Sequence, residues 1–302
     1  MAKPQRSLAG EVVAITGGAR GIGRATAAAL IAQGARVAIG DIDAELARGT
    51  AAELGSGTVG LALDVTDSAS FERFLEQAET HLGPLDILIN NAGIMPIGPF
   101  VEETEAIAQR MVDINLHGVI NGCKLAIKRF TPRRRGHIVN IASMAGKTGV
   151  PGGATYCATK HGVFGLSDSL RQELRGSGID VSVVMPIGVN TELYSGASQM
   201  RGFKTPEPED VAKAIVDALR ARRFEVYVPK AMNATVRLTA ILPRRVSDGV
   251  AKLLKADQTL TATDRQARAA YQARIVETVA VGERRPAVGE PEVEVEVEKE
   301  TV

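Results

Sequence analysis

The stretch VVAITGGARGIGRATAAALIAQ, residues 12–33, joins a short apolar run to a glycine-rich turn and then to a helical pattern. Residues 12–16 are almost continuously apolar, which is typical of a strand buried on both faces of a parallel sheet. Beyond the turn, Ile22, Ala25, Ala29 and Leu30 recur on one face, which predicts a helix over residues 21–33. The stretch therefore opens a β-α-β unit.

The same alternation continues along the chain. We predict further strands at residues 36–41, 58–64, 85–90, 137–142, 179–185 and 225–228, and further helices at 43–54, 67–82, 102–130, 154–175 and 209–221. Alternating strands and helices favour a parallel sheet with right-handed crossovers and helices on both faces. The sequence thus predicts the α/β class, with a doubly wound parallel sheet in a single domain over residues 1–230.

Composition limits the kind of protein this is. The chain has 302 residues, a net charge of +1 and only two cysteines, Cys123 and Cys157. The charge gives no reason to expect nucleic acid as a partner, and the cysteines favour a reducing compartment. The first ten residues lack the apolar core of a secretory signal, and no apolar run approaches the ~20 residues of a membrane span. We expect a cytoplasmic protein, and the scattered histidines predict no metal site.

The pattern changes after residue 230. Apolar residues recur at helical spacing through residues 231–255, although Pro243 should break or kink that helix: Leu238, Leu242, Val246, Val250 and Leu254. A further short helix is expected over residues 266–279, so residues 231–285 form a helical C-terminal extension. Residues 286–302 hold six glutamates and one lysine, which favours a disordered acidic tail.

The glycine-rich turn predicts a nucleotide site. Its spacing is G-x-x-x-G-x-G and it lies at the first strand–helix junction, where a pyrophosphate can approach backbone N–H groups at the start of the helix. The residues expected to contact the nucleotide here are Gly17, Gly18, Arg20, Gly21, Ile22 and Gly23. A tight strand–helix connection without a ligand is the plainer alternative.

Asp41 ends the second predicted strand, where a carboxylate can accept hydrogen bonds from the adenosine ribose and repel a 2′-phosphate. Capping the next helix is the alternative role for this carboxylate, and Asp43 could fill it equally well. Arg20 would favour a 2′-phosphate instead. We expect the negative charge to dominate, so NAD is favoured over NADP.

Polar or glycine-containing segments also follow the other strands. Asp64 and Val65 come after the third strand, and Asn91, Ala92 and Gly93 after the fourth. Since ligands bind outside the carboxyl ends of strands in open α/β sheets, these segments predict one shared crevice.

Tyr156 and Lys160 are four residues apart and so share one face of a predicted helix, with Ser143 at the end of the preceding strand. A free tyrosine has a pKa near 10, and lowering that pKa by ~3 requires about 4 kcal/mol. A lysine ammonium ~4 Å away supplies roughly that much at an effective dielectric constant of ~20. The spacing alone is common on exposed helix faces.

Taken together, residues 16–23 (TGGARGIG), residues 90–93 (NNAG), Asn115, Ser143 and residues 156–160 (YCATK) resemble the short-chain dehydrogenase/reductase family. The match covers residues 8–230 with every motif in order. It implies a Rossmann-fold domain, oxidoreduction of an alcohol/carbonyl pair with a pyridine nucleotide, and a homodimer or homotetramer.

The resemblance also implies roles for residues. Tyr156 is expected to be the general acid/base, Lys160 its pKa partner and a ribose ligand, and Ser143 the donor to the substrate oxygen. Asn115 is expected to hold a proton-relay water, and residues 91–93 to support the adenosine half of the cofactor. Pro186, Val189 and Thr191 occupy the family's nicotinamide-side segment, in which Ile187 replaces a glycine. Because of that replacement, we expect the backbone of this segment to follow a different path.

The expected substrate side is mostly apolar: Ile94, Met95, Pro96, Ile97, Met144, Val150, Leu193 and Tyr194. This favours a small lipophilic alcohol or ketone and an NAD(H)-dependent dehydrogenase. The alternatives are an NADP(H)-dependent carbonyl reductase and, from another class, a nucleotide-binding scaffold or sensor without turnover.

The apolar face of residues 231–255 can be buried against the pocket mouth, a neighbouring subunit or an anionic membrane surface. Packing on the protein itself is favoured over packing on a membrane.

Overall fold

In a computed structural model, which describes residues 5–55, 57–255 and 258–283, seven parallel strands form one sheet in the order β3-β2-β1-β4-β5-β6-β7. The strands are β1 (Val12–Thr16), β2 (Arg36–Asp41), β3 (Thr58–Ala62), β4 (Ile87–Asn90), β5 (Gly136–Ile141), β6 (Ile179–Pro186) and β7 (Glu225–Val228). The predicted doubly wound sheet is confirmed. The expected acidic tail at residues 286–302 lies outside the described residues.

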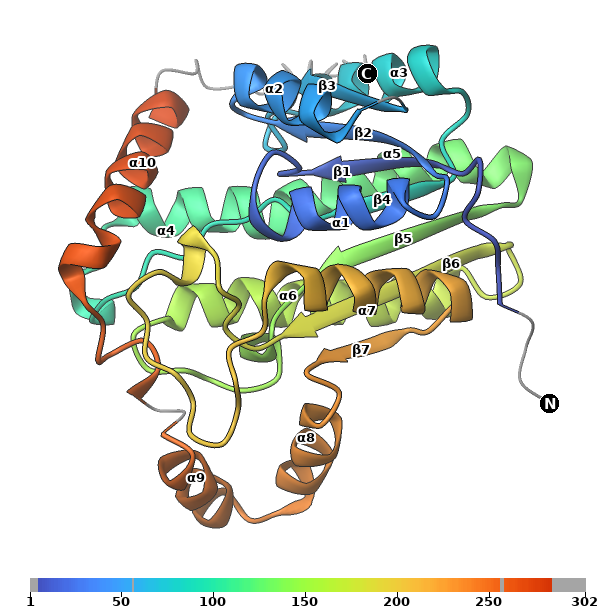
Figure 1. Cartoon of the computed structure of the whole chain (residues 1–302). Helices are drawn as coiled ribbons and strands as arrows, with labels where there is room; N and C mark the ends of the chain where they lie inside the picture. The colour runs from blue at the N-terminus through green and yellow to red at the C-terminus, as the bar shows by residue number, and fades with distance from the viewer. Residues whose placement is uncertain (1–4, 56, 256–257, 284–302) are drawn as a thin grey trace, which may run out of the picture.

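Helices cover both faces of this sheet (Figure 1). On one face lie α1 (Gly21–Ile31), α2 (Ala44–Leu54) and α7 (Pro208–Ala221), and on the other α3 (Ser68–Leu82), α5 (Gly118–Arg133) and α6 (Ala154–Glu173). Because side chains alternate along a strand, Val13 and Ile15 of β1 enter one core cluster while Val12 and Ala14 enter the other. Two buried layers of aliphatic side chains thus hold the strand ends in place.

The single helix predicted over residues 102–130 is wrong in detail. The chain forms a short 3₁₀ turn (Phe100–Glu102), then α4 (Glu105–Val112), a π-helical turn (Asp113–His117) and α5. The Thr104 hydroxyl accepts a hydrogen bond from the N–H of Ile107 and so begins α4. π-turns add a residue to a helix and are frequent at functional sites. Here the π-turn contains Asn115.

In the described part of the C-terminal extension the chain forms three helices, α8 (Met232–Ile241), α9 (Arg244–Leu253) and α10 (Arg265–Glu283). Leu242, which precedes Pro243, has extended backbone angles (φ −82°, ψ 145°), as a residue before proline prefers. Of the two predicted effects of Pro243, the structure shows a break between α8 and α9 and not a kink within one helix. α10 stands beside α4, at the edge of the sheet toward which the strand arrows point (Figure 1).

The apolar stripe expected in residues 231–255 is not buried as one face. Leu242 and Leu254 line the main cavity, whereas Leu238 and Val246 are exposed, because the break at Pro243 interrupts the face that the spacing implies. The side chain of Val250 lies outside what the structure describes.

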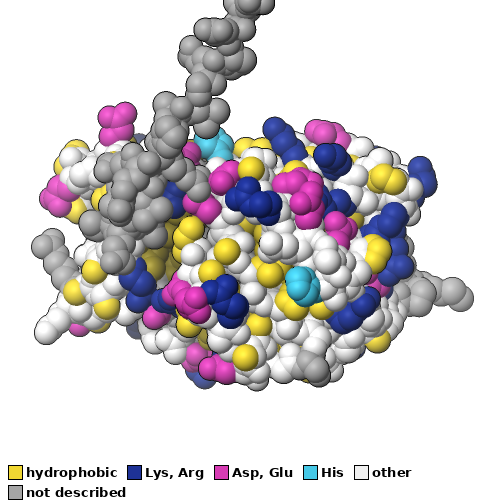
Figure 2. All heavy atoms as spheres, turned by 90° about the horizontal axis from the view of Figure 1, so that it is seen from above, with side chains coloured by type: hydrophobic (Ala, Val, Ile, Leu, Met, Phe, Trp, Pro, Cys, Tyr) yellow, Lys and Arg dark blue, Asp and Glu magenta, His cyan; other side chains and the backbone are white. Residues whose placement is uncertain are grey.

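Surface charge shows no large single-sign region in the view of Figure 2. Lys and Arg side chains are interspersed with Asp and Glu over this face. Among the described residues, no helix is long and apolar enough to cross a membrane.

Candidate active site

A cavity of about 1140 Å³ lies outside the carboxyl ends of the strands. It brings together most of the residues expected to contact a nucleotide, namely Gly17, Arg20, Gly21, Ile22, Asp41, Asp64, Val65, Asn91, Ala92, Gly93, Tyr156, Lys160, Pro186, Val189 and Thr191. Gly18, Gly23 and Asn115 do not line it. In the described part of the chain, no cluster of His, Cys, Asp or Glu could hold a metal ion.

The glycines of the first turn serve two purposes. Gly17 has a φ of +62°, and a Cβ there would lie 2.9 Å from the Cα of Ala92. A Cβ on Gly18 would lie 2.5 Å from Ile39 Cβ, and one on Gly23 would lie 2.2 Å from the Gly17 carbonyl oxygen. Gly18 and Gly23 therefore allow close packing of the turn, while Gly17 and Gly21 face the cavity.

α1 begins at Gly21 without a side-chain cap and without an acidic residue in its first turn. Its first N–H groups are therefore left for a ligand, and a helix N-terminus favours an anion. Asn91 holds the next loop against this turn, since its Nδ2 donates to the carbonyls of Thr16 and Gly17, each at 2.9 Å. These residues fit the pyrophosphate of a dinucleotide.

Asp41 lies at the end of β2, with one carboxylate oxygen accepting from the N–H of Ala19 (3.3 Å) and the other from that of Asp43 (3.2 Å). Asp43 accepts from Leu46 and caps α2, so the capping alternative belongs to Asp43. Burial raises the pKa of Asp41. The Arg20 guanidinium pairs with Asp43 at 3.1 Å and with Glu192 at 3.6 Å, so two carboxylates already offset its charge.

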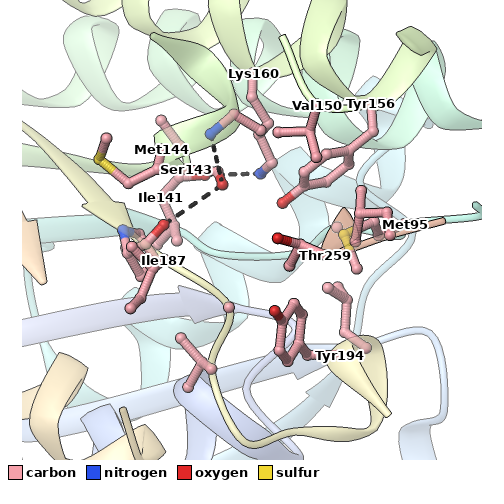
Figure 3. A pocket seen from close by; sticks show the side chains of 18 of the residues that line it. Met95, Ile141, Ser143, Met144, Val150, Tyr156, Lys160, Ile187, Tyr194 and Thr259 are labelled. Carbon is pink, nitrogen blue, oxygen red and sulfur yellow. Dashed lines mark hydrogen bonds between the residues drawn. The ribbon is translucent and has the colours of Figure 1, made fainter. Parts of the chain in front are cut away.

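Tyr156, Ser143 and Lys160 lie together at the other end of the cavity (Figure 3). Tyr156 and Lys160 come from α6, and Ser143 follows β5. Ser143 Oγ accepts from the N–H of Ala145 at 3.1 Å and donates to the Pro186 carbonyl at 3.5 Å. Lys160 Nζ donates to the Ile141 carbonyl at 2.9 Å and lies 5.7 Å from the centre of the Tyr156 ring.

The pKa of Tyr156 does not follow the sequence-based expectation. Burial raises the pKa of this phenol, although a hydrogen bond with Ser143 acts in the opposite direction. Burial also lowers the pKa of Lys160 to about 8. The lysine therefore faces the tyrosine ring without bringing the pKa of the phenol below its usual value, because burial of the phenol disfavours its charged form.

Asn115 is fully buried and holds the backbone after β4. Its Oδ1 accepts from the N–H of Ile94 and its Nδ2 donates to the Ile94 carbonyl, both at 2.8 Å, and Nδ2 also donates to Thr159 Oγ1 at 3.3 Å. A Cβ on Gly93 would lie 3.1 Å from Asn115 Oδ1 and 3.7 Å from Lys160 Nζ. Asn115 is thus adjacent to the Tyr156–Lys160 pair without reaching the cavity.

The segment after β6 follows a regular path despite Ile187. The N–H of Ile187 donates to the Val228 carbonyl at 2.9 Å, which extends the pairing of β6 with β7 by one residue. Its side chain is buried and lines the cavity. A Cβ on Gly188 would lie 2.0 Å from the Tyr194 ring, so a larger residue here would displace that ring.

The substrate end contains residues that sequence reasoning missed. Beside the expected Met95, Met144, Val150, Leu193 and Tyr194, the cavity is lined by Thr259, Leu260 and Tyr271 from the C-terminal extension. Tyr271 lies three residues after Arg268 in α10, but this pair matches no motif. Only the tertiary structure places it beside the active site.

Comparisons with known proteins agree with this geometry. Residues 11–202 match the family model described as short chain dehydrogenase. The chain is 42% identical to a sorbitol dehydrogenase of Cereibacter sphaeroides over 190 residues, which are 63% of this chain and 74% of that protein. It is 39% identical to a 3-alpha-(or 20-beta)-hydroxysteroid dehydrogenase of Mycobacterium bovis over 213 residues, covering 69% and 82% of the two chains.

Among solved structures, a short-chain dehydrogenase/reductase from Burkholderia phymatum in complex with NAD has a TM-score of 0.72 and 27% sequence identity. The similarity covers 78% of this chain and 94% of that one. The glycine turn at the start of α1, the doubly wound sheet and the family match lead to one assignment. The chain belongs to the short-chain dehydrogenase/reductase family and is an NAD(P)-dependent oxidoreductase.

Proposed function

We propose that this protein is an NAD(H)-dependent oxidoreductase that interconverts a lipophilic secondary alcohol and its ketone, or an alcohol/aldehyde pair, with Tyr156 as general acid/base. The observation that carries the proposal is the placement of Tyr156 and Ser143 together in one cavity, with Lys160 behind the tyrosine ring. A protein that only binds a nucleotide has no need of this arrangement.

The chain's own residues would handle the proton and the substrate oxygen. The nicotinamide nucleotide, when bound, accepts a hydride from the alcohol carbon or returns one to the carbonyl carbon. In the direction of reduction, Tyr156 Oη gives its proton to the substrate oxygen, and Ser143 Oγ turns its hydrogen from the long 3.5 Å bond with the Pro186 carbonyl to that oxygen. In the direction of oxidation, Tyr156 takes the alcohol proton. Because burial raises its pKa, Tyr156 is protonated at neutral pH and is suited to reduction without further adjustment.

Lys160 would assist through its positive charge. Its ammonium is buried and is held by the Ile141 carbonyl. From this position it favours the phenolate form of Tyr156, and it lines the cavity where a ribose hydroxyl could accept its hydrogen bond. Asn115 would act on the same site through the Ile94 backbone that it holds.

NAD is the cofactor that the adenosine end of the cavity supports best. Asp41 presents a carboxylate there, and Arg20 is engaged by Asp43 and Glu192. A 2′-phosphate would meet the negative charge of Asp41, while Arg20 is already paired with Asp43 and Glu192. The alternative is an NADP(H)-dependent carbonyl reductase, in which Arg20 would leave these carboxylates.

A lipophilic substrate fits the apolar lining near Tyr156. Met95, Met144, Val150, Ile187 and Leu260 supply aliphatic surface there. The two named relatives are a sorbitol dehydrogenase and a hydroxysteroid dehydrogenase, so their names support an alcohol/carbonyl pair but not one substrate. Arg244, Asp248 and Lys252 of α9 also line the cavity, with charges of both signs.

We further propose that residues 1–230 form the catalytic domain, that residues 231–285 act as a lid on the substrate end, and that the chain assembles as a homodimer or homotetramer. Leu242, Leu254 and Leu260 support the lid, because all three line the cavity from the extension.

An absorbance assay of NADH formation and consumption tests the function. The purified full chain is screened against lipophilic alcohols with NAD⁺ and against lipophilic ketones with NADH, and each positive substrate is repeated with NADP(H). We expect turnover of at least one alcohol/ketone pair with NAD(H). NADH binding without turnover of any substrate would favour the nucleotide-binding scaffold instead.

A further inference from the structure

α10 is joined to the substrate end of the cavity by a buried arginine. The Arg268 side chain is 1% exposed and donates to the carbonyls of Leu193 and Ser195, each at 3.0 Å, and also to the Met95 carbonyl. Met95 follows β4, whereas Leu193 and Ser195 follow β6. One guanidinium thus ties two active-site loops to the C-terminal helix. Arg268 is in this sense a positioning residue.

Tyr271 lies one helical turn beyond Arg268 and is held from two sides. The Arg268 guanidinium carbon lies 4.8 Å from the centre of the Tyr271 ring, and the N–H of Met95 donates to Tyr271 Oη at 2.8 Å. The ring lines the cavity. Tyr271 is also close enough to Tyr156 to contribute electrostatically to the raised pKa of Tyr156.

The Tyr271 hydroxyl has a hydrogen left to donate. It accepts from Met95, and among the described residues no acceptor takes its own proton. Burial raises the pKa of Tyr271 to about 12, so the phenol keeps this proton at neutral pH. A half-buried hydroxyl that accepts one bond and still holds a free donor favours a ligand with an acceptor atom at that place.

Tyr194 lines the same cavity, but its hydroxyl is bonded differently. Its hydroxyl donates to the Ser198 carbonyl at 2.8 Å, so its proton is already used within the protein. Although both tyrosines line the substrate end, only Tyr271 of the two offers an unused O–H group there.

We infer that Tyr271 is a specificity-determining residue whose hydroxyl donates a hydrogen bond to a second oxygen of the substrate, distinct from the oxygen at Tyr156 and Ser143. The inference rests on the proposed function. The preferred substrates are then lipophilic alcohols or ketones that carry a further hydroxyl, carbonyl or ether oxygen near the reacting carbon. Arg268 holds the helix in the position that this contact requires.

The test compares two ligands that differ by one hydroxyl group, cyclohexanol and 1,2-cyclohexanediol. Their affinities for the full chain saturated with NADH are measured by isothermal titration, a condition in which an alcohol cannot be oxidised. For the wild type we expect the diol to bind more tightly than the mono-alcohol. Tyr271→Phe should weaken binding of the diol by about 3- to 10-fold, which is the effect expected from losing one neutral hydrogen bond. The same variant should weaken binding of the mono-alcohol by less than about 2-fold.

Tyr194→Phe is the matched control. It removes a hydroxyl that is bonded within the protein, so it should change both affinities by the same factor. The inference is overturned if the wild type does not prefer the diol, or if Tyr271→Phe changes both affinities equally or neither. Because no turnover is needed, a protein that keeps the Tyr271 effect but oxidises no alcohol would contradict the proposed chemistry alone.

Discussion

At the scale of single residues, Asp41 should determine the choice of cofactor. Unit charges ~4 Å apart interact by about 1 kcal/mol in water and about 4 kcal/mol at an effective dielectric constant of ~20. Asp41→Ala removes that repulsion, so we expect the ratio of kcat/KM for NAD(H) over NADP(H) to fall at least about tenfold. Steady-state kinetics with both cofactors measure this ratio. A wild type that prefers NADP(H) would mean that Arg20, not Asp41, dominates.

The pH dependence of the two directions should also differ. Oxidation needs the deprotonated phenol of Tyr156, whose pKa is raised by burial, so its rate should increase as the pH rises from neutral toward the pKa of about 8 at Lys160. Reduction needs the protonated phenol and should change little over the same range. Initial rates at constant ionic strength measure both profiles. An oxidation rate that fell with rising pH in this range would contradict a tyrosine base.

The raised pKa of Tyr156 also shows what single-residue reasoning from sequence misses. The Tyr156–Lys160 spacing correctly predicts that both side chains share one face of α6 and one cavity. It does not reveal that Lys160 is 5% exposed or that its ammonium is held by the Ile141 carbonyl. Desolvation depends on every segment that covers the site, and those segments come from distant parts of the chain.

At the scale of helices and strands, α10 should matter for substrate more than for cofactor. Arg268→Met leaves buried carbonyls without their donor, at a cost of roughly 1–3 kcal/mol for each. We expect KM for the substrate to rise about tenfold and the melting temperature to fall, while the dissociation constant of NADH changes by less than about 2-fold. Kinetics, thermal denaturation and NADH fluorescence measure the three quantities.

Arg274→Gln is the control for that variant. Arg274 pairs with Glu192 at the surface, and exposed pairs contribute about 0–1 kcal/mol. Arg274→Gln should therefore leave the substrate KM nearly unchanged. Arg268→Lys, which keeps a buried donor, should have a lower substrate KM than Arg268→Met. Equal effects of Arg268→Met on NADH and on substrate would contradict a role confined to the substrate end.

The helices and strands predicted best from the sequence are those whose pattern of apolar residues and turns lies within a few neighbouring residues. β1, β2 and β7 have the predicted bounds because apolar runs between turns mark buried parallel strands. The π-turn at residues 113–117 has no signature in composition, so the sequence predicts one continuous helix over 102–130. The contact of α10 with the loops after β4 and β6 joins residues more than 70 positions apart, such as Arg268 and Leu193, and no local pattern encodes it.

At the scale of the whole molecule, we expect assembly into two or four chains. Phe100 and Val101 beside α4 are 67% and 91% exposed, which is unusual for large apolar side chains and consistent with an interface. Light scattering at micromolar concentration should give two or four times the chain mass of 31.9 kDa. Val101→Asp should lower that mass if this surface is buried in the assembly. A wild-type mass equal to one chain would contradict the expectation.

The central claim is that Tyr156 transfers the proton at the substrate oxygen, and Tyr156→Phe tests it most directly. The change removes the hydroxyl and keeps the ring that packs among Met95, Cys157 and Leu260. With the best substrate from the NADH absorbance screen, we predict that kcat/KM falls by ~10²–10⁴-fold while NADH fluorescence gives an almost unchanged dissociation constant. A variant that binds NADH normally and keeps most of the wild-type activity would contradict the claim.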